Sequence, residues 1–185
     1  MADIEAVDLF CGVGGLSYGL VDAGIEVKAG IDLDSACRYP FEKNLRARFV
    51  EKNIREVSAD TVNGFYSDRA FRLLAGCAPC QPFSSMARSK KSVQGDKWGL
   101  LDEFTRLVKA VQPDFVTMEN VPGVKAYAPF LSFMETLDEF GYFYDWKIVN
   151  CSDIGVPQRR HRLVLVASKH GRIKIDIPKG DPVSV

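Results

Sequence analysis

The stretch that decides the fold is residues 4–32, IEAVDLFCGVGGLSYGLVDAGIEVKAGID. A short apolar run, residues 4–10, ends at a glycine-rich turn, and residues 15–23 follow with apolar side chains at helical spacing. A second apolar run, residues 26–32, then ends among acidic residues. A strand, a glycine turn, a helix and another strand in this order are typical of an α/β domain with a largely parallel sheet.

The rest of the chain continues this alternation. Apolar runs predict strands at residues 71–77, 115–118, 143–151 and 163–167, and helical spacing predicts helices at residues 34–45, 101–111 and 126–140. Pro40 is expected to disturb the first of these helices. Residues 172–177 alternate like one edge strand, and the prolines after them indicate a linker. We therefore predict a core domain over residues 1–168, and an edge strand with the start of a linker over residues 169–185.

Composition excludes several classes of protein. The 185 residues fit one domain, and 24 basic against 24 acidic residues argue against a strongly basic nucleic-acid coat protein, although a local basic patch stays open. No apolar run approaches the ~18 residues that a membrane span needs, and no signal peptide is recognisable. The five cysteines show no disulfide framework. We expect a reduced, cytoplasmic protein without a membrane partner.

The glycine-rich turn is a candidate cofactor site. Gly12, Gly14 and Gly15 let a ligand approach the backbone beside a helix N-terminus, and Asp32 is placed to hydrogen-bond a ribose. Ser17 stands where a dinucleotide fingerprint has glycine or alanine. A nucleoside cofactor without a pyrophosphate therefore fits better, and a plain strand-to-helix turn is the alternative.

Two further segments carry reactive side chains after predicted strands. Cys80 lies between prolines in GCAPCQPFS, residues 76–84, where the crevice of a parallel sheet opens. Glu119 directly follows an apolar strand, so we expect it to be partly desolvated and suited to proton donation. The alternatives are a redox pair of Cys77 with Cys80 and an ordinary turn acid.

Basic residues form a third segment, QRRHR at residues 158–162, which in isolation is typical of a solvated surface. A structural zinc site is not predicted, because the chain has one CxxC pair and neither His161 nor His170 has ligand spacing. We expect no bound metal. Cys11, Cys37 and Cys151 are expected to be small core residues.

Together, five segments resemble the DNA (cytosine-5) methyltransferase family, in the order of that family. They are the cofactor loop DLFCGVGGLS, the acidic GIDLD, the nucleophile segment GCAPCQPFS, MENVPG, and DIGVPQRRHRLVLVAS. The resemblance covers the chain from Asp8 to about Ser168. It implies a Rossmann-like S-adenosylmethionine-dependent methyltransferase fold, a mostly parallel twisted sheet with helices on both faces, with residues 1–168 as the catalytic core.

The resemblance also implies the reaction, methyl transfer from S-adenosylmethionine to C5 of cytosine in duplex DNA after base flipping. Cys80 is then the nucleophile that adds to C6, and Glu119 contacts N3 and the exocyclic amine. Arg162 helps to hold the base and the activated thiolate. Arg160 is expected to be a supporting or phosphate contact.

Binding residues follow from the same resemblance. Phe10 would pack on the adenine, Asp32 would bind the ribose, and the remaining cofactor contacts are Gly12, Gly14, Gly15, Asn53, Ile54 and Pro79. The family usually has an aspartate, contacting the adenine amine, where Asn53 stands. The loop over residues 84–99 is expected to close on the flipped base. DNA contacts are expected from Gln81, Ser84, Arg88, Lys90, Lys91 and Lys97.

The motifs of the second half of the family, including its target-recognition domain, are not found in the sequence. We therefore predict the catalytic half of a split or truncated enzyme, with a second polypeptide supplying that domain, in a bacterial, archaeal or phage-encoded system. The alternatives are a tRNA cytosine-5 methyltransferase, a catalytically silent DNA-binding subunit that needs a partner, and a nicotinamide-dependent oxidoreductase.

Overall fold

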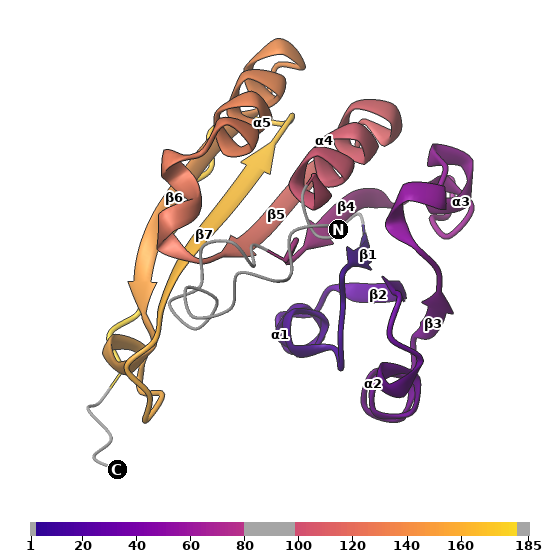
Figure 1. The fold of residues 1–185 in the computed structure, drawn as a ribbon, viewed down its shortest axis with the longest axis horizontal. Helices are drawn as coiled ribbons and strands as arrows, with labels where there is room; N and C mark the ends of the chain where they lie inside the picture. Colours follow the sequence, from indigo (N-terminus) through magenta and orange to yellow (C-terminus); the bar gives the residue numbers. More distant parts are fainter. Residues whose placement is uncertain (1–2, 80–98, 181–185) are drawn as a thin grey trace, which may run out of the picture.

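A computed structural model describes residues 3–79 and 99–180 and places seven strands in one sheet (Figure 1). The spatial order is β3-β2-β1-β4-β5-β7-β6. The strands are β1 (Ile4–Leu9), β2 (Glu26–Asp32), β3 (Arg48–Glu51), β4 (Phe71–Gly76), β5 (Phe115–Asn120), β6 (Phe143–Asn150) and β7 (His161–Ser168). The pairings from β3 through β5 are parallel, whereas β7 runs antiparallel to both β5 and β6.

Helices cover both faces of this sheet (Figure 1). One face packs against α3 (Ala59–Asn63), α4 (Leu100–Val111) and α5 (Ala128–Glu139), and the other packs against α1 (Gly15–Asp22) and α2 (Arg38–Leu45). Phe104 and Phe133 are fully buried in the first layer, and Phe41 is fully buried in the second. The predicted class, a mostly parallel α/β sheet with helices on both faces, is confirmed.

Short 3-10 turns connect these elements. They are η1 (Ser35–Cys37), η2 (Ile54–Glu56), η5 (Pro122–Ala126) and η6 (Cys151–Ile154). Pro40 does not disturb the helix in which it lies, contrary to the sequence-based expectation. The α-helix begins at Arg38, so Pro40 occupies its first turn, where the backbone N–H groups have no acceptor within the helix.

The chain after β7 departs from the prediction, because residues 172–177 form no strand. Side chains of β6 hold this segment instead. The Ile175 N–H donates to Asp145 Oδ2 at 2.9 Å, and the Lys147 ammonium donates to the Ile175 carbonyl oxygen. The backbone therefore meets side chains that project from the edge strand, so no ladder of backbone hydrogen bonds forms between them.

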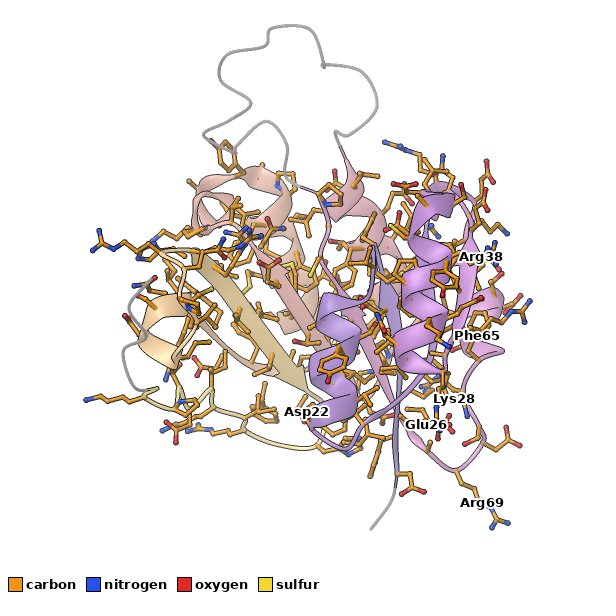
Figure 2. All side chains as sticks on the ribbon, turned by 90° about the horizontal axis from the view of Figure 1, so that it is seen from below. Asp22, Glu26, Lys28, Arg38, Phe65 and Arg69 are labelled. Atoms are coloured by element: carbon orange, nitrogen blue, oxygen red, sulfur yellow. The ribbon has the colours of Figure 1, made fainter. Side chains whose placement is uncertain are left out.

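Ion pairs at the amino ends of the parallel strands are remote from the cofactor loop. Lys28 lies 2.9 Å from Glu26 and 3.4 Å from Glu5, and Figure 2 shows Glu26 and Lys28 together at this end of the sheet. The carboxyl ends of the same strands carry the motif residues. In an open α/β sheet that is the edge at which ligands bind.

Candidate active site

The loop after β1 is tied to the end of β2 by Asp32. The Gly12 N–H donates to Asp32 Oδ2 at 2.8 Å, and the Asp34 N–H donates to Asp32 Oδ1 at 3.0 Å. A carboxylate offers about four acceptor positions, so Asp32 retains capacity for further donors such as ribose hydroxyls. Phe10 has φ +58°, an unusual value for a residue with a side chain, and this loop therefore has a fixed and uncommon shape.

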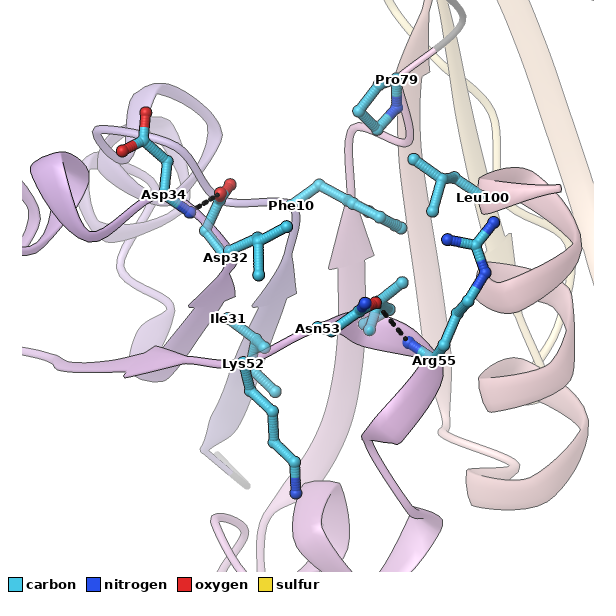
Figure 3. Close-up of a pocket in the computed structure, with 11 residues that line it drawn as sticks. Phe10, Ile31, Asp32, Asp34, Lys52, Asn53, Arg55, Pro79 and Leu100 are labelled. Atoms are coloured by element: carbon cyan, nitrogen blue, oxygen red, sulfur yellow. Dashed lines mark hydrogen bonds between the residues drawn. The ribbon is translucent and has the colours of Figure 1, made fainter. Parts of the chain in front are cut away.

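A cavity of about 670 Å³ opens beside this loop (Figure 3). Its walls come from the ends of β1, β2 and β4, from η2 and from the start of α4. The lining residues are Phe10, Ile31, Asp32, Leu33, Asp34, Lys52, Asn53, Ile54, Arg55, Pro79 and Leu100. The structure thus brings five predicted cofactor residues together around one cavity: Phe10, Asp32, Asn53, Ile54 and Pro79.

The three predicted glycines are not among the lining residues, and they differ from one another. A Cβ atom at Gly14 would lie 2.5 Å from Leu45 Cδ1 and 3.0 Å from Phe41 Cδ2, so Gly14 is needed for the close packing of α2. A Cβ atom at Gly12 or Gly15 would meet nothing within 4 Å. Only Gly12 and Gly15 therefore leave open space in which a ligand can approach the backbone.

Asp8 is a buried acid that the sequence did not single out as a site residue. Its side chain is fully buried, Ser17 Oγ donates to Oδ2 at 2.6 Å, and Oδ1 has no hydrogen-bond partner among the described residues. Burial raises the pKa of Asp8 to about 7, and the nearby negative charge of Asp32 adds to that effect. Ser17 is itself fully buried, so it serves Asp8 and is not available to a ligand.

Glu119 and Arg162 form an ion pair at the carboxyl end of β5. Their side chains are 31% and 22% exposed, so the pair is partly desolvated and still accessible to a substrate. Glu119 pairs with Val164 across the antiparallel strands, and Arg162 lies two residues before Val164 on the same face of β7. The antiparallel direction of β7 thus places the start of this strand beside the end of β5.

Asn120 fixes the segment that precedes Cys80. Its side chain is buried, Nδ2 donates to the Ala78 carbonyl oxygen at 3.1 Å, and Oδ1 accepts the Val121 N–H at 2.8 Å. The end of β5 thereby holds the chain after β4 in place. The sequence analysis missed this role, although a polar residue at the end of an apolar strand is a signal that could have indicated it.

Burial raises the thiol pKa of three described cysteines, Cys11, Cys37 and Cys77, which is the opposite of activation. Burial raises the pKa of the Cys77 thiol, and the neighbouring carboxylates of Glu119 and Asp8 raise it further. Cys11 lies in the core as expected. Cys37 is partly buried and packs against the same core, and Cys151 is only partly buried.

Several predicted site residues lie outside the described part of the chain, namely Cys80, Gln81, Ser84, Arg88, Lys90, Lys91 and Lys97. Arg160 is described and exposed; its carbonyl oxygen accepts the Cys151 N–H at 2.8 Å. Within residues 3–79 and 99–180, no group of three or more potential metal ligands occurs. No helix in the same residues is long and apolar enough to cross a membrane.

Comparison with solved structures identifies the class of this fold. The chain is similar to a structure described as a DNA modification methyltransferase encoded within a prophage (E. coli), with a TM-score of 0.80 and 30% identity over 98% of this chain and 53% of that chain. DNMT2 of Spodoptera frugiperda shares the fold, with a TM-score of 0.74 at 19% identity over 96% of this chain and 57% of that chain. The fold is that of the Rossmann-like, S-adenosylmethionine-dependent methyltransferases.

Residues 4–182 match the family model for C-5 cytosine-specific DNA methylase, and the chain belongs to this family. It is 48% identical to the type II methylase M.HgiDII of Herpetosiphon aurantiacus, over 95% of this chain and 50% of that protein. It is 32% identical to the type II methyltransferase M.XorII of Xanthomonas oryzae, over 89% of this chain and 40% of that protein. The chain thus spans about half the length of these relatives, or less.

Proposed function

We propose that this chain is the catalytic half of a DNA (cytosine-5-)-methyltransferase. The observation that carries the proposal is the Glu119–Arg162 ion pair, which lies at the same edge of the sheet as the cavity. The segment after β4, with Ala78 and Pro79, lies between the cavity and the ion pair, and the next residue in the sequence is Cys80. This chemistry needs an acid, a guanidinium group and a cysteine, all beside a cavity that can hold a nucleoside.

The cavity fits S-adenosylmethionine, the cofactor that we propose. Phe10, Ile31 and Leu100 supply apolar walls for a flat base, and the Asp32 carboxylate supplies acceptors for ribose hydroxyls. Open space at Gly12 and Gly15 leaves room for the remaining part of the molecule beside the backbone. When bound, S-adenosylmethionine supplies a methyl group made electrophilic by a sulfonium centre.

Covalent activation of the cytosine is the step that we assign to Cys80 and Glu119. The Cys80 thiolate adds to C6, and the electron pair of the C5–C6 bond moves so that C5 becomes nucleophilic. Glu119 in its acid form donates a proton to N3 and so offsets the charge that develops on the ring. After C5 accepts the methyl group, a base removes the C5 proton, the Cys80–C6 bond breaks so that Cys80 leaves as the thiolate, and N3 returns its proton to Glu119.

Arg162 positions the Glu119 side chain and stabilises the carboxylate that Glu119 becomes when its proton is transferred to N3. Its guanidinium group is ion-paired with Glu119 and fixed further by donation to the His161 carbonyl oxygen at 2.8 Å. The base must leave the duplex before it can reach these groups. We assign Arg160, Gln81, Ser84, Arg88, Lys90, Lys91 and Lys97 to contacts with the DNA, mainly with its phosphates.

Target recognition is assigned to a partner segment outside these 185 residues. The chain covers only half of M.HgiDII, and a second polypeptide carrying the remaining half is the arrangement that we propose. The cytoplasm of a bacterium, an archaeon or a phage-infected cell is the proposed place of action, because DNA and the cofactor are both present there.

The test is covalent trapping on duplex DNA that contains 5-fluorocytosine, with S-adenosylmethionine present and the second half of M.HgiDII supplied in trans. Fluorine at C5 cannot be removed as a proton, so the Cys80–C6 bond persists and the adduct is visible on a denaturing gel. The chain should form the adduct, Cys80→Ser should form none, and Glu119→Gln should form it roughly 100-fold more slowly. Glu139→Gln, an exposed acid at the end of α5, is the matched control and should react normally.

Substrate class is decided by matched DNA and RNA strands in the same assay. Adduct formation on RNA alone would replace the DNA proposal with the tRNA methyltransferase alternative. If the complemented chain forms no adduct on either strand but still binds DNA, it is a catalytically silent binding subunit. Binding of a nicotinamide dinucleotide in place of S-adenosylmethionine would favour the oxidoreductase.

A further inference from the structure

Cys77 is the neighbour of Glu119 on the β4 side, whereas Arg162 adjoins Glu119 on the β7 side. β4 and β5 pair in parallel, and their register places Gly76 beside Met118. The next residues of the two segments are Cys77 and Glu119, and the Cys77 N–H still donates to the last carbonyl oxygen of β1 at 3.3 Å. Side chains alternate between the two faces of a sheet, so Cys77 and Glu119 project next to each other from one face.

The Cys77 thiol is a hydrogen-bond donor to the Glu119 carboxyl group. Burial raises the pKa of this thiol most, and the charge of Glu119 and a hydrogen bond to its side chain raise it further. A hydrogen bond that raises the pKa of a thiol is one in which the protonated sulfur donates, because a carboxylate can only accept. The thiol therefore keeps its proton at neutral pH and remains a donor.

The fold keeps Cys77 at this position. Asn120 Nδ2 donates to the carbonyl oxygen of Ala78, the residue after Cys77, at 3.1 Å. Asn120 directly follows Glu119, so the two segments are tied together one residue beyond the thiol and the carboxyl group. A movement of Cys77 away from Glu119 would therefore work against a buried hydrogen bond.

Two donors on different strands thus act on one carboxyl group. The Arg162 guanidinium group approaches Glu119 from β7 as its ion-pair partner, and the Cys77 thiol approaches it from the end of β4. A hydrogen-bond donor favours the ionised form of a carboxyl group and fixes the direction of its oxygens. When Glu119 gives its proton to N3 of the cytosine, both donors stabilise the carboxylate that is left.

We propose that Cys77 is a positioning residue for the methyl-transfer reaction, whose thiol orients the Glu119 carboxyl group and stabilises the carboxylate formed when the proton passes to N3. This inference rests on the proposed function, because it takes Glu119 to be the acid in the reaction. Cys77 makes no covalent bond to the substrate, and its own proton stays on sulfur throughout.

The experiment is the trapping assay on duplex DNA that contains 5-fluorocytosine, with the second half of M.HgiDII again supplied in trans. Cys77→Ala and Cys77→Ser remove the same sulfur atom, but only Cys77→Ser keeps a donor. Cys77→Ala should slow adduct formation about five-fold, the value of one hydrogen bond, and Cys77→Ser should stay within about two-fold of the parent chain. Cys151→Ala, which removes a partly buried thiol from η6, is the matched control and should react at the parent rate.

Two further measurements separate positioning from a general structural role. The affinity for S-adenosylhomocysteine, measured by calorimetry, should be the same for the parent chain and both Cys77 variants, since Cys77 does not line the cavity. In a Glu119→Gln background no carboxylate forms during the reaction, so adding Cys77→Ala should cost less than about two-fold further.

Other outcomes overturn the inference. If Cys77→Ala reacts like the parent chain, if Cys77→Ala and Cys77→Ser slow the reaction equally, or if the five-fold loss persists in the Glu119→Gln background, then Cys77 does not act through a hydrogen bond to Glu119. A loss of affinity for S-adenosylhomocysteine would likewise assign the effect to a disturbed cavity. If the parent chain itself forms no adduct, the proposed function fails and this inference fails with it, whereas a reactive parent chain with any of these patterns refutes the role of Cys77 alone.

Discussion

Replacing Asp8 with asparagine should stabilise the protein most at and above neutral pH, and the gain should vanish only near pH 4, the usual pKa of an aspartate. Asp8 is fully buried, its Oδ2 accepts the Ser17 hydroxyl, and its Oδ1 has no partner among the described residues. An ionised carboxylate at this position therefore lacks most of the hydrogen bonds that would compensate for burial. Asparagine has nearly the same shape and carries no charge at any pH.

The size of the effect follows from the pKa of this carboxyl group. Burial raises it from 3.8 to about 7 in the folded protein. Between these values the folded protein keeps a proton that the unfolded chain has lost, so the free energy of unfolding falls as the pH rises. A shift of roughly three pKa units corresponds to about 4 kcal/mol at most, and the full difference is present above the folded pKa.

The assay is urea unfolding of the parent chain and of Asp8→Asn between pH 5 and 8.5. The variant should gain about 2–4 kcal/mol relative to the parent chain at pH 8, and the gain should shrink steadily toward pH 5. Ser17→Ala removes the side-chain hydrogen bond that helps to lower the pKa of Asp8, so it should extend this pH-dependent loss to higher pH. A difference between Asp8→Asn and the parent chain that stays constant with pH would show that Asp8 does not titrate in this range.

Three other substitutions test separate parts of the structure. Asn120→Ala removes the donor to the Ala78 carbonyl, so trapping on 5-fluorocytosine DNA should slow by about ten-fold while the affinity for S-adenosylhomocysteine, measured by calorimetry, stays unchanged. Gly14→Ala should cost about 2–4 kcal/mol in urea unfolding, because its φ is +93° and the new Cβ would lie 2.5 Å from Leu45 Cδ1. The pKa of Asp114 lies below its usual value: burial alone would raise this pKa, but the hydrogen bonds and ion pairs of the carboxylate lower it by more. Asp114→Asn should therefore cost about 1 kcal/mol at pH 7, and this loss should disappear as the pH falls below that lowered pKa.

Hydrophobic periodicity was sufficient to predict most of the fold, because most predicted strands and helices bury one apolar face or a continuous apolar run. The elements that it missed are short. β3 has four residues, RFVE, with charges at both ends, and α3 has five. In such elements the tertiary contacts decide the conformation, and local sequence preference contributes little.

The site was predictable in its residue types but not in its connections. The order of the motifs indicated Glu119 and Arg162 separately, yet their pairing depends on the antiparallel register of β5 and β7, which no local pattern specifies. The same holds for Gly14, whose packing role depends on where α2 lies. The roles of Cys80 and the basic residues up to Lys97 stay predictions, since they lie outside the described residues.

The antiparallel placement of β7 also sets the order in which the site forms while the chain is being synthesised. Residues that line the cavity lie between Phe10 and Leu100, so all of them have been made before β5 is complete. Glu119 then has no guanidinium partner until β6 and β7 have been made and paired with β5. The cavity can therefore assemble on the ribosome before the Glu119–Arg162 ion pair exists.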